Sequence, residues 1–277
     1  MPDGARVRAA AGKVCVAAVQ MVSAPEVAPN LEAAARLIAA AAAAGAKLVA
    51  LPEYFCILGR HETDKVMVRE ADGYGPIQDF LAGAASRNRV WLVGGTIPLV
   101  SLNEEKVRSA CLVFDSEGRR VARYDKMHLF GLDLGEQRFD ESRTIEPGEQ
   151  PVAIDTPFGR IGLSVCYDLR FPELYRALGV VDALLVPSAF TSVTGAAHWE
   201  LLVRARAVEN QCYVIAPAQG GLHPNGRRTH GHSMIVDPWG EVLASRAEGE
   251  GIVLAELDAG RLAEVRQSLP ALQHRKM

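Results

Sequence analysis

The sequence predicts an α/β protein built as a single domain, in which mixed sheets are covered by helices. Short apolar runs rich in β-branched residues alternate with helical segments along most of the 277 residues, the pattern of repeated β-α-β units. Other strands come in pairs that only a short turn separates, which is typical of hairpins. No linker, repeat or change of composition divides the chain. We therefore expect one domain over residues 14–277, preceded by a tail at residues 1–13.

The first half of the chain begins with a strand, a helix and a second strand. Residues 14–20 alternate and are rich in valine, and residues 31–44 form an alanine-rich helix that Asn30 caps. Residues 47–51 form the next strand, which Pro52 closes. The remaining predicted elements of this half are a helix at 77–86, a strand at 90–94, and a hairpin whose strands at 110–115 and 119–125 flank Ser-Glu-Gly.

The second half continues the alternation after another hairpin. Its strands at 151–155 and 160–165 flank Thr-Pro-Phe-Gly, and a helix begins at Pro172. The elements that follow are a strand at 183–186, a helix from about 196 to 210, a strand at 213–216, a hairpin at 233–236 and 241–245, a strand at 252–257, and a last helix near Arg261.

Charge and cysteine content exclude several classes of function. The net charge of −3 and the lack of any run of five like charges leave no basic surface for nucleic acid. No apolar run is long enough to span a bilayer or to form a signal peptide. The five cysteines contain no Cys-x-x-Cys pair, so we expect no disulfide framework and a reducing, cytoplasmic setting. His230 and His232 lack a third ligand at metal spacing, so no metal site is expected.

Three reactive side chains stand at or beside predicted strand ends. Glu53 follows one strand, Lys126 follows a second, and Cys166 follows a third. Long segments without clear periodicity begin directly after two of them, at residues 55–75 and 127–150, and loops of that length in a compact domain are usually functional or disordered. If the three strands share a sheet edge, a carboxylate, an ammonium and a thiol converge there. From spacing alone, inert packing of the cysteine and a surface ion pair remain open.

Cys166 lies where a strand gives way to a helix, and ligands of α/β sheets bind at such strand ends. Asp168 is expected to cap the helix that contains Pro172 in its first turn. Free N–H groups at a helix start lower a thiol pKa and receive an oxyanion, here through the N–H of Tyr167. A carboxylate can take the thiol proton, and an ammonium can stabilise the oxyanion that forms when the thiolate attacks a carbon–nitrogen bond.

Three segments carry a resemblance to a known family. Leu-Pro-Glu-Tyr-Phe at 51–55, Tyr-Asp-Lys-Met-His-Leu-Phe at 124–130 and Gly-Leu-Ser-Val-Cys-Tyr-Asp-Leu-Arg-Phe-Pro-Glu-Leu at 162–174 resemble the signature segments of the nitrilase superfamily of carbon–nitrogen hydrolases, in the order of that family. The resemblance runs from about Val14 to the C-terminus. It implies a four-layer α-β-β-α sandwich that pairs into homodimers through helices.

The resemblance also implies roles for individual residues. Glu53 corresponds to the general base, Lys126 to the ammonium that stabilises the oxyanion, and Cys166 to the nucleophile. Family amidases have a second glutamate that positions the substrate, and Glu141 matches it, although a solvated loop charge is the alternative. A cycle of this kind needs no metal or cofactor.

Later segments resemble one branch of the superfamily. Residues 187–200, 204–214 and 231–240 are similar to the branch that contains the nitrilase-like domain fused to a histidine-triad nucleotide hydrolase and the amidases of deaminated glutathione. The substrate that this implies is a small 2-oxo acid amide, which is hydrolysed through a thioester to an acid and ammonia or an amine. The loops at 55–75 and 220–229 are expected to select its length.

A substrate with an anionic end calls for a cationic or N–H-rich patch. Arg170 is one candidate, and a salt bridge to Glu173 or another buried carboxylate is the equally weighted alternative. Backbone groups at Phe190 and Thr191, just past a predicted strand end, are expected to line the pocket beside the thioester.

Other functions remain open on the sequence. An omega-amidase of 2-oxoglutaramate, a true nitrilase and an N-carbamoyl hydrolase would use the same three residues. A serine hydrolase is a poor second, because the segment around Ser164 lacks the last glycine of a Gly-x-Ser-x-Gly elbow. A catalytically idle scaffold is disfavoured by the intact set of Glu53, Lys126 and Cys166.

Overall fold

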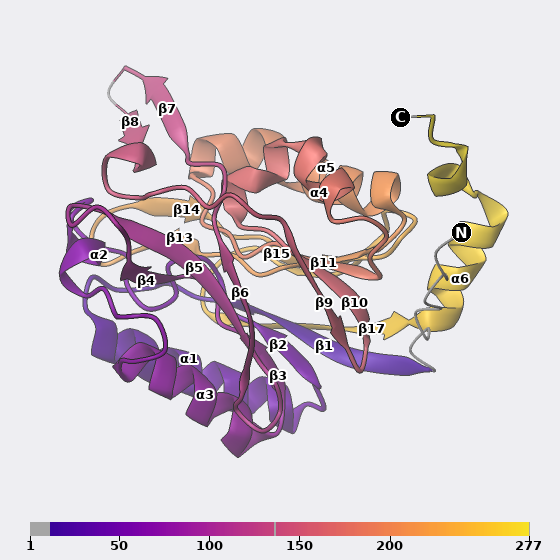
Figure 1. Cartoon of the computed structure of the whole chain (residues 1–277), viewed down its shortest axis with the longest axis horizontal. Coiled ribbons are helices and arrows are strands. Elements are labelled where there is room, and N and C mark those ends of the chain that lie inside the picture. Colours follow the sequence, from indigo (N-terminus) through magenta and orange to yellow (C-terminus); the bar gives the residue numbers. More distant parts are fainter. Residues whose placement is uncertain (1–11, 136, 277) are drawn as a thin grey trace.

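Two sheets stack face to face, and helices cover the outer face of each, so the molecule has four layers in the order α-β-β-α (Figure 1). The computed structural model describes residues 12–135 and 137–276. The expected sandwich is therefore confirmed. Strand β1 already begins at Lys13, so the predicted tail of residues 1–13 extends one residue too far. Residues 1–11 of that tail lie outside the described residues.

The first sheet has strand order β17-β1-β2-β3-β5-β4, with β6 paired to β5. Strands β1, β2 and β3 are parallel, and the helices α1 (Val27–Ala43) and α3 (Pro76–Asn88) connect them. The strands are β1 (Lys13–Gln20), β2 (Leu48–Ala50), β3 (Trp91–Val93), β4 (Ile97–Val100), β5 (Val107–Phe114), β6 (Arg120–Asp125) and β17 (Gly251–Asp258).

The second sheet has the order β16-β15-β12-β11-β10-β9. Its central strands β10, β11 and β12 are parallel, and they are connected by α4 (Pro172–Ala177) and α5 (Ser192–Asn210) on the outer face (Figure 1). The strands are β9 (Val152–Thr156), β10 (Gly159–Leu163), β11 (Ala183–Leu185), β12 (Tyr213–Ala216), β15 (Ser233–Val236) and β16 (Val242–Arg246).

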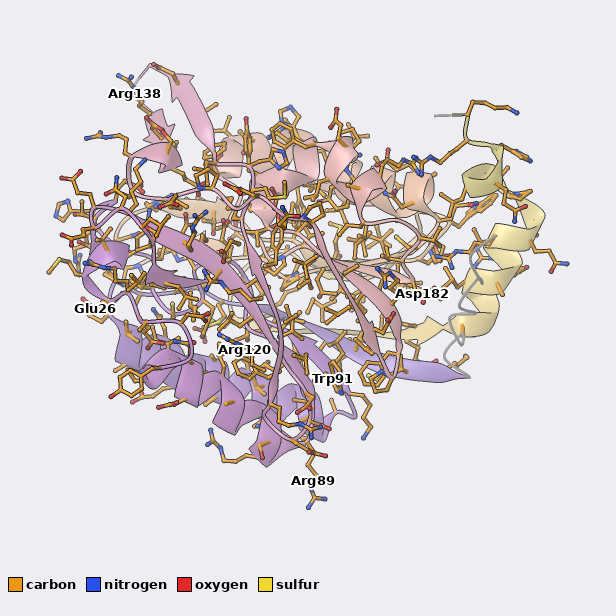
Figure 2. All side chains as sticks on the ribbon, in the orientation of Figure 1. Glu26, Arg89, Trp91, Arg120, Arg138 and Asp182 are labelled. Carbon is orange, nitrogen blue, oxygen red and sulfur yellow. The ribbon has the colours of Figure 1, made fainter. Side chains whose placement is uncertain are left out.

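The alternation of β1 shows how the two cores form. Val16 and Ala18 belong to the cluster that contains the second sheet, whereas Ala17 and Val19 pack with apolar residues of α1 and α3. Successive side chains of a strand point to opposite faces, so one strand serves both layers. Figure 2 shows side chains filling the spaces between the layers, with charged residues such as Arg89 and Arg138 at the rim.

Shorter elements lie at the ends of the sheets and in the two long segments. The segment 55–75 contains α2 (Asp64–Met67), and the segment 127–150 contains a hairpin and a 3₁₀ turn. The hairpin strands are β7 (Gly131–Leu134) and β8 (Gln137–Asp140), the turn is Glu141–Arg143, a second hairpin consists of β13 (Gly220–Leu222) and β14 (Arg228–His230), and the C-terminal part contains α6 (Ala259–Ser268) and a 3₁₀ turn at Ala271–His274.

One expected helix cap in this half of the chain was wrong, and one strand was missed. Helix α1 begins at Val27, one turn before Asn30, whose buried amide instead bonds to Ala24 and to the carbonyl of Cys56. Strand β4 was not predicted, because Pro98 interrupts its apolar run. Proline is tolerated there because β4 ends the strand order, where β5 pairs along one edge and an isolated bridge to Glu70 lies on the other.

No helix within the described residues is both long enough and apolar enough to cross a membrane.

Candidate active site

Side chains from both sheets meet at one end of the sandwich. Lys126, directly after β6, places its Nζ 2.8 Å from Oε1 of Glu53 and 2.7 Å from Oε2 of Glu141. The Cys166 thiol, at the end of the second sheet, faces the Glu53 carboxylate closely enough for each group to shift the pKa of the other. All four side chains are buried, with Cys166 and Glu141 each 7% exposed. The structure thus brings together all three side chains that the sequence places at strand ends, with Glu141 as the fourth.

The backbone turns sharply at Cys166. Strand β10 ends at Leu163, and Cys166 opens a 3₁₀ helix (Cys166–Arg170) with a φ of 49°. A non-glycine residue in this left-handed region costs about 1–3 kcal/mol, so the surroundings must hold it there. The N–H of Cys166 donates to the carbonyl of Pro187 at 2.9 Å, which ties this turn to the end of β11.

Asp168 holds this turn from within. Its carboxylate accepts the N–H of Val165 at 2.8 Å and the hydroxyl of Tyr124 at 2.6 Å, and it also accepts the N–H of His128 at 3.0 Å. The side chain is fully buried. The expectation that Asp168 caps the helix at Pro172 is therefore wrong, because Phe171 occupies that position. It connects the Cys166 turn to the chain on either side of Lys126.

The charges of the cluster shift one another. Burial raises the pKa of the Glu53 carboxyl, and Glu141 adds to that rise while Lys126 opposes it. Burial and the nearby Glu53 also raise the pKa of the Cys166 thiol well above its usual range. Burial alone would lower the pKa of Lys126, but Glu141 and Glu53 hold it well above its usual range. The thiol is thus protonated at rest, and Glu53 beside it is the group placed to accept its proton.

Glu141 is part of this cluster and is not a solvated loop charge. Its Oε2 accepts from Lys126 and from the N–H of Phe130 at 2.7 Å, and its Oε1 accepts the hydroxyl of Tyr54 at 2.6 Å. Burial would raise its pKa, yet the Lys126 ammonium and these donors lower it. Glu141 therefore stays ionised and fixes the Lys126 ammonium beside Glu53.

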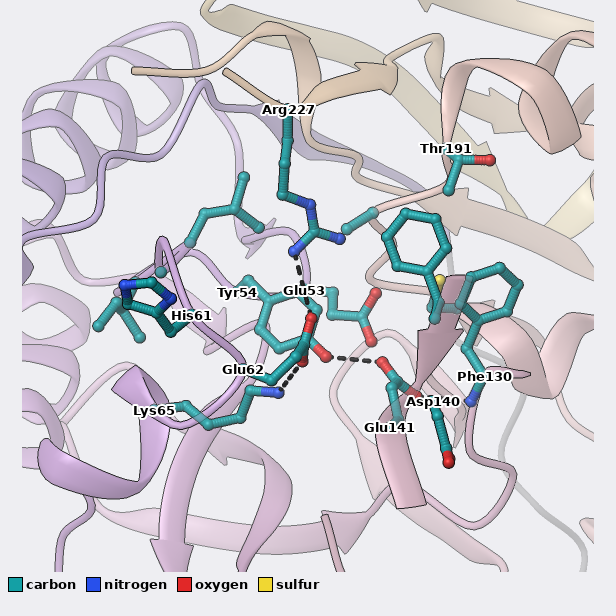
Figure 3. Close-up of a pocket in the computed structure, with 16 residues that line it drawn as sticks. Glu53, Tyr54, His61, Glu62, Lys65, Phe130, Asp140, Glu141, Thr191 and Arg227 are labelled. Carbon is teal, nitrogen blue, oxygen red and sulfur yellow. Dashed lines mark hydrogen bonds and ion pairs between the residues drawn. The ribbon is translucent and has the colours of Figure 1, made fainter. Parts of the chain in front are cut away.

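Two adjoining pockets share Cys166. We call the first the Glu53 pocket; its empty volume, counted to the open mouth, is about 620 Å³. It is lined by Glu53, Tyr54, Ile57, Leu58, Gly59, His61, Glu62, Lys65, Phe130, Phe139, Asp140, Glu141, Cys166, Ala189, Thr191 and Arg227 (Figure 3). We call the second the Arg170 pocket, which is lined by Phe130, Cys166, Tyr167, Arg170, Ala189, Phe190, Thr191 and Thr194.

The predicted substrate contacts fall mainly in the Arg170 pocket. The Arg170 guanidinium lies 5.5 Å from the ring centre of Phe190, and both of its terminal nitrogens lie 3.3 Å from Nδ1 of His198. Within the described chain it makes no ion pair, so the alternative salt bridge to Glu173 is wrong. Thr191 lines both pockets and caps α5, accepting the N–H of Thr194 through its side chain. Tyr167 follows Cys166 in the same turn.

Sequence reasoning missed the cations of the Glu53 pocket. Lys65 comes from α2 and Arg227 from the turn between β13 and β14, and Figure 3 shows both reaching toward Glu62. The loops that carry them were expected to select substrate length, but neither cation was singled out. The run Asn225-Gly226-Arg227-Arg228 at a hairpin turn was the available signal. No cluster of three or more His, Cys, Asp or Glu side chains in the described part of the chain is arranged to hold a metal ion.

A model of the carbon–nitrogen hydrolase family matches residues 15–267. The chain belongs to this family. A relative from Synechocystis, named deaminated glutathione amidase, is 45% identical over 94% of this chain and 97% of its own length. The carbon–nitrogen hydrolases of known structure include the nematode Caenorhabditis elegans NitFhit protein, which superposes with a TM-score of 0.87 at 38% identity. That match covers 96% of this chain and 65% of the nematode chain.

A third member links the family to cysteine chemistry. An amidase from Nesterenkonia sp. AN1 superposes with a TM-score of 0.79 at 26% identity, over 95% of this chain and 94% of the amidase. Its structure, of a glutamate-to-glutamine mutant, shows an acetamide group added covalently at the active-site cysteine. This carbon–nitrogen hydrolase chain is thus similar to a protein in which a cysteine attacks small amide-like molecules. It is an enzyme of the amidase class.

Proposed function

We propose that this hydrolase uses Cys166 as its nucleophile to hydrolyse a small 2-oxo acid amide, with deaminated glutathione as its substrate. The observation that carries the proposal is the buried cluster in which the Cys166 thiol faces Glu53 while Lys126 is held between Glu53 and Glu141. The name of the Synechocystis relative supports the choice of substrate.

The proposed cycle uses groups of this chain alone. Glu53 accepts the proton of Cys166, and the thiolate attacks the amide carbon. The Lys126 ammonium and the N–H of Tyr167 stabilise the oxyanion, since fixed donors in a buried site stabilise developing charge strongly. Glu53 then gives the proton to the departing amine or ammonia, which leaves a thioester on Cys166. Water activated by Glu53 releases the acid and restores the thiol.

The remaining groups position the substrate. Glu141 keeps Lys126 in place and lines the pocket wall, where it can accept an N–H of the amide. Arg170, which makes no ion pair with any described residue, offers a cation to an anionic end of the substrate, and Phe190 and Thr191 line the same pocket with their backbone beside the thioester.

The test is 2-oxo acid release from deaminated glutathione and from 2-oxoglutaramate, measured side by side with the purified protein. We expect deaminated glutathione to give the higher kcat/KM. Preference for 2-oxoglutaramate would instead indicate an omega-amidase, nitrile turnover a nitrilase, and carbon dioxide release an N-carbamoyl hydrolase. The variant Cys166→Ala should lose turnover on every substrate while its thermal unfolding stays cooperative. Activity that persists in this variant would contradict the mechanism.

We further propose that the enzyme works in the cytoplasm as a homodimer. All five cysteines of the chain are free thiols in the structure, which suits a reducing compartment. Helix α5 on the outer layer exposes apolar side chains, which suits pairing through helices. Apart from a second copy of the chain, the molecule that we expect the enzyme to bind is its small amide substrate.

A further inference from the structure

Cys166 has a cation-bearing pocket on each side. The Glu53 pocket contains Lys65 and Arg227, and the Arg170 pocket contains Arg170. A nucleophile between two such pockets suits a substrate whose scissile amide lies in the middle, with an anionic group at each end.

Glu53 distinguishes the two sides. It lines the first pocket and is absent from the lining of the second. A departing amine must be protonated as the carbon–nitrogen bond breaks, so it has to lie within hydrogen-bond reach of the acid that protonates it. The leaving amine therefore lies in the Glu53 pocket, and the acyl group extends toward Arg170.

Arg227 is the cation that is open to a ligand in the Glu53 pocket. Lys65 is nearly buried, and its Nζ already donates to Glu62 at 2.8 Å and to Thr144 at 3.1 Å. Arg227 stands 3.9 Å from the other oxygen of Glu62 and rests over the ring of Phe139. Within the described residues, its guanidinium donates no hydrogen bond. Glu62 is thus shared by two cations, and one positive charge remains for a ligand.

The other acidic residue at this end of the pocket does not cancel that charge. Asp140 is exposed, and its Oδ1 accepts both the N–H and the hydroxyl of Ser142. Figure 3 shows its carboxylate directed away from Arg227.

We propose that the Glu53 pocket is the leaving-group pocket and that Arg227 binds a carboxylate carried by the leaving amine. This inference rests on the proposed function and deepens it. An arginine matches a carboxylate through two parallel N–H donors, which gives affinity and orientation together. An amine formed from two amino acids, extended, spans about 7 Å between its nitrogen and its terminal carboxylate. The enzyme then prefers an amide of a small peptide to a primary amide.

The reaction balances with such a leaving group. The bond from Sγ of Cys166 to the acyl carbon forms, and the bond from that carbon to nitrogen breaks. The proton that Glu53 took from the thiol passes to the nitrogen, so the peptide leaves as a neutral amine. Water then cleaves the thioester, which yields the 2-oxo acid and the free thiol.

The experiment compares three substrates that share one acyl group. The first is the 2-oxoglutaryl amide of cysteinylglycine, the second is the same compound with a terminal carboxamide, and the third is 2-oxoglutaramate. In Arg227→Met, kcat/KM for the first should fall by about tenfold or more relative to the other two, mainly through KM, because a charge-assisted contact is lost. Release of the 2-oxo acid is the readout.

The matched control is Arg228→Met. Arg228 belongs to the same hairpin, but it is exposed, pairs with Glu248 and does not line the pocket. It should leave the ratio between the substrates unchanged. If Arg227→Met lowers all three rates equally, or lowers none, the inference is overturned while the proposed function stands. A wild-type enzyme that fails to cleave the first substrate would overturn the proposed function itself.

Discussion

One cation between two carboxylates sets the acid–base balance of the site. Lys126 contacts Glu53 and Glu141, and the thiol of Cys166 faces Glu53. Burial raises the pKa of Glu53, and the Lys126 ammonium opposes that rise. The Glu141 carboxylate offsets part of this opposition, so it keeps the pKa of Glu53 higher than Lys126 alone would leave it. The residues around Glu53 thus determine the pH range in which this base is ionised.

We predict that Glu141→Gln moves the acid limb of the kcat/KM profile to lower pH. The base is active as a carboxylate, so the rate rises as pH passes through the pKa of Glu53. Removing the Glu141 charge takes away one cause of the raised pKa, and the Lys126 charge then acts on Glu53 alone. The value of kcat should fall as well, because Lys126 loses one of its two partners. An acid limb that stays in place or moves to higher pH would contradict this account.

Asp168 is a positioning residue for Cys166 and Lys126. It accepts hydrogen bonds from Val165, Tyr124 and His128, so it connects the nucleophile turn to the segment that carries the ammonium. In Asp168→Asn, one acceptor oxygen becomes a donor, and at least one of these buried donors loses its partner. We expect a loss of about 2 kcal/mol in stability and a drop in kcat with little change in KM.

A second readout separates positioning from general destabilisation. The rate at which iodoacetamide alkylates Cys166 should fall in Asp168→Asn at a temperature where the protein is fully folded. Tyr124→Phe, which removes only one of the donors, should fall between this variant and the wild type. An alkylation rate equal to the wild type would show that Asp168 contributes to stability alone.

At the scale of elements, α5 is fixed where it meets both pockets. Thr191 caps the helix through its hydroxyl and also lines both pockets. Thr191→Ala should lower the free energy of unfolding by about 1 kcal/mol, and Thr191→Ser should restore most of it. Denaturant titration measures both. Because the backbone is retained, KM should change little; a large rise in KM would assign the hydroxyl to substrate binding.

Element-level patterns explain which parts of the fold could be read from the sequence. The strand before Glu53 is a short apolar run that Pro52 closes, and the strand before Lys126 is the second half of a hairpin around Ser-Glu-Gly, so both residues were placed correctly at strand ends. The functions of Asn30 and Asp168 could not be read this way. Both look like helix caps in sequence, yet their buried side chains satisfy backbone groups of distant segments. Local patterns do not reveal such long-range partners.

At the scale of the whole molecule, the site exists only because the two sheets stack. Glu53 and Lys126 follow strands of the first sheet, and Cys166 follows a strand of the second. Alternating strands and helices predict mixed sheets but not which faces meet, since that depends on contacts far apart in sequence. The family resemblance supplied the sandwich. The two cations of the Glu53 pocket were missed for the same reason, because α2 and the β13–β14 turn approach each other only in the folded chain.

The outer face of α5 leads to the last prediction. Leu201 is 68% exposed, and Val208, seven residues later, lies on the same stripe of the helix. Trp239 is also more than half exposed, and the neighbouring Gly240 lies beside α5, where it accepts a hydrogen bond from Arg204. An apolar stripe of this kind on an outer layer is typical of a surface that another molecule covers.

We expect a second copy to cover this stripe, because packing α5 against α5 of a partner extends the sandwich of each subunit. Leu201→Glu places a charge at the centre of that contact and should convert a dimer to a monomer in sedimentation velocity, since an unpaired charge in an apolar interface is costly. Leu102→Glu is the matched control, because Leu102 is also exposed, at 94%, and lies on the loop between β4 and β5. A wild-type protein that sediments as a monomer would exclude the dimer. A Leu201→Glu variant that remains dimeric would assign the dimer contact to another surface. Because α5 begins at Thr191 in the wall of both pockets, a monomeric variant would also show how far substrate binding depends on the dimer.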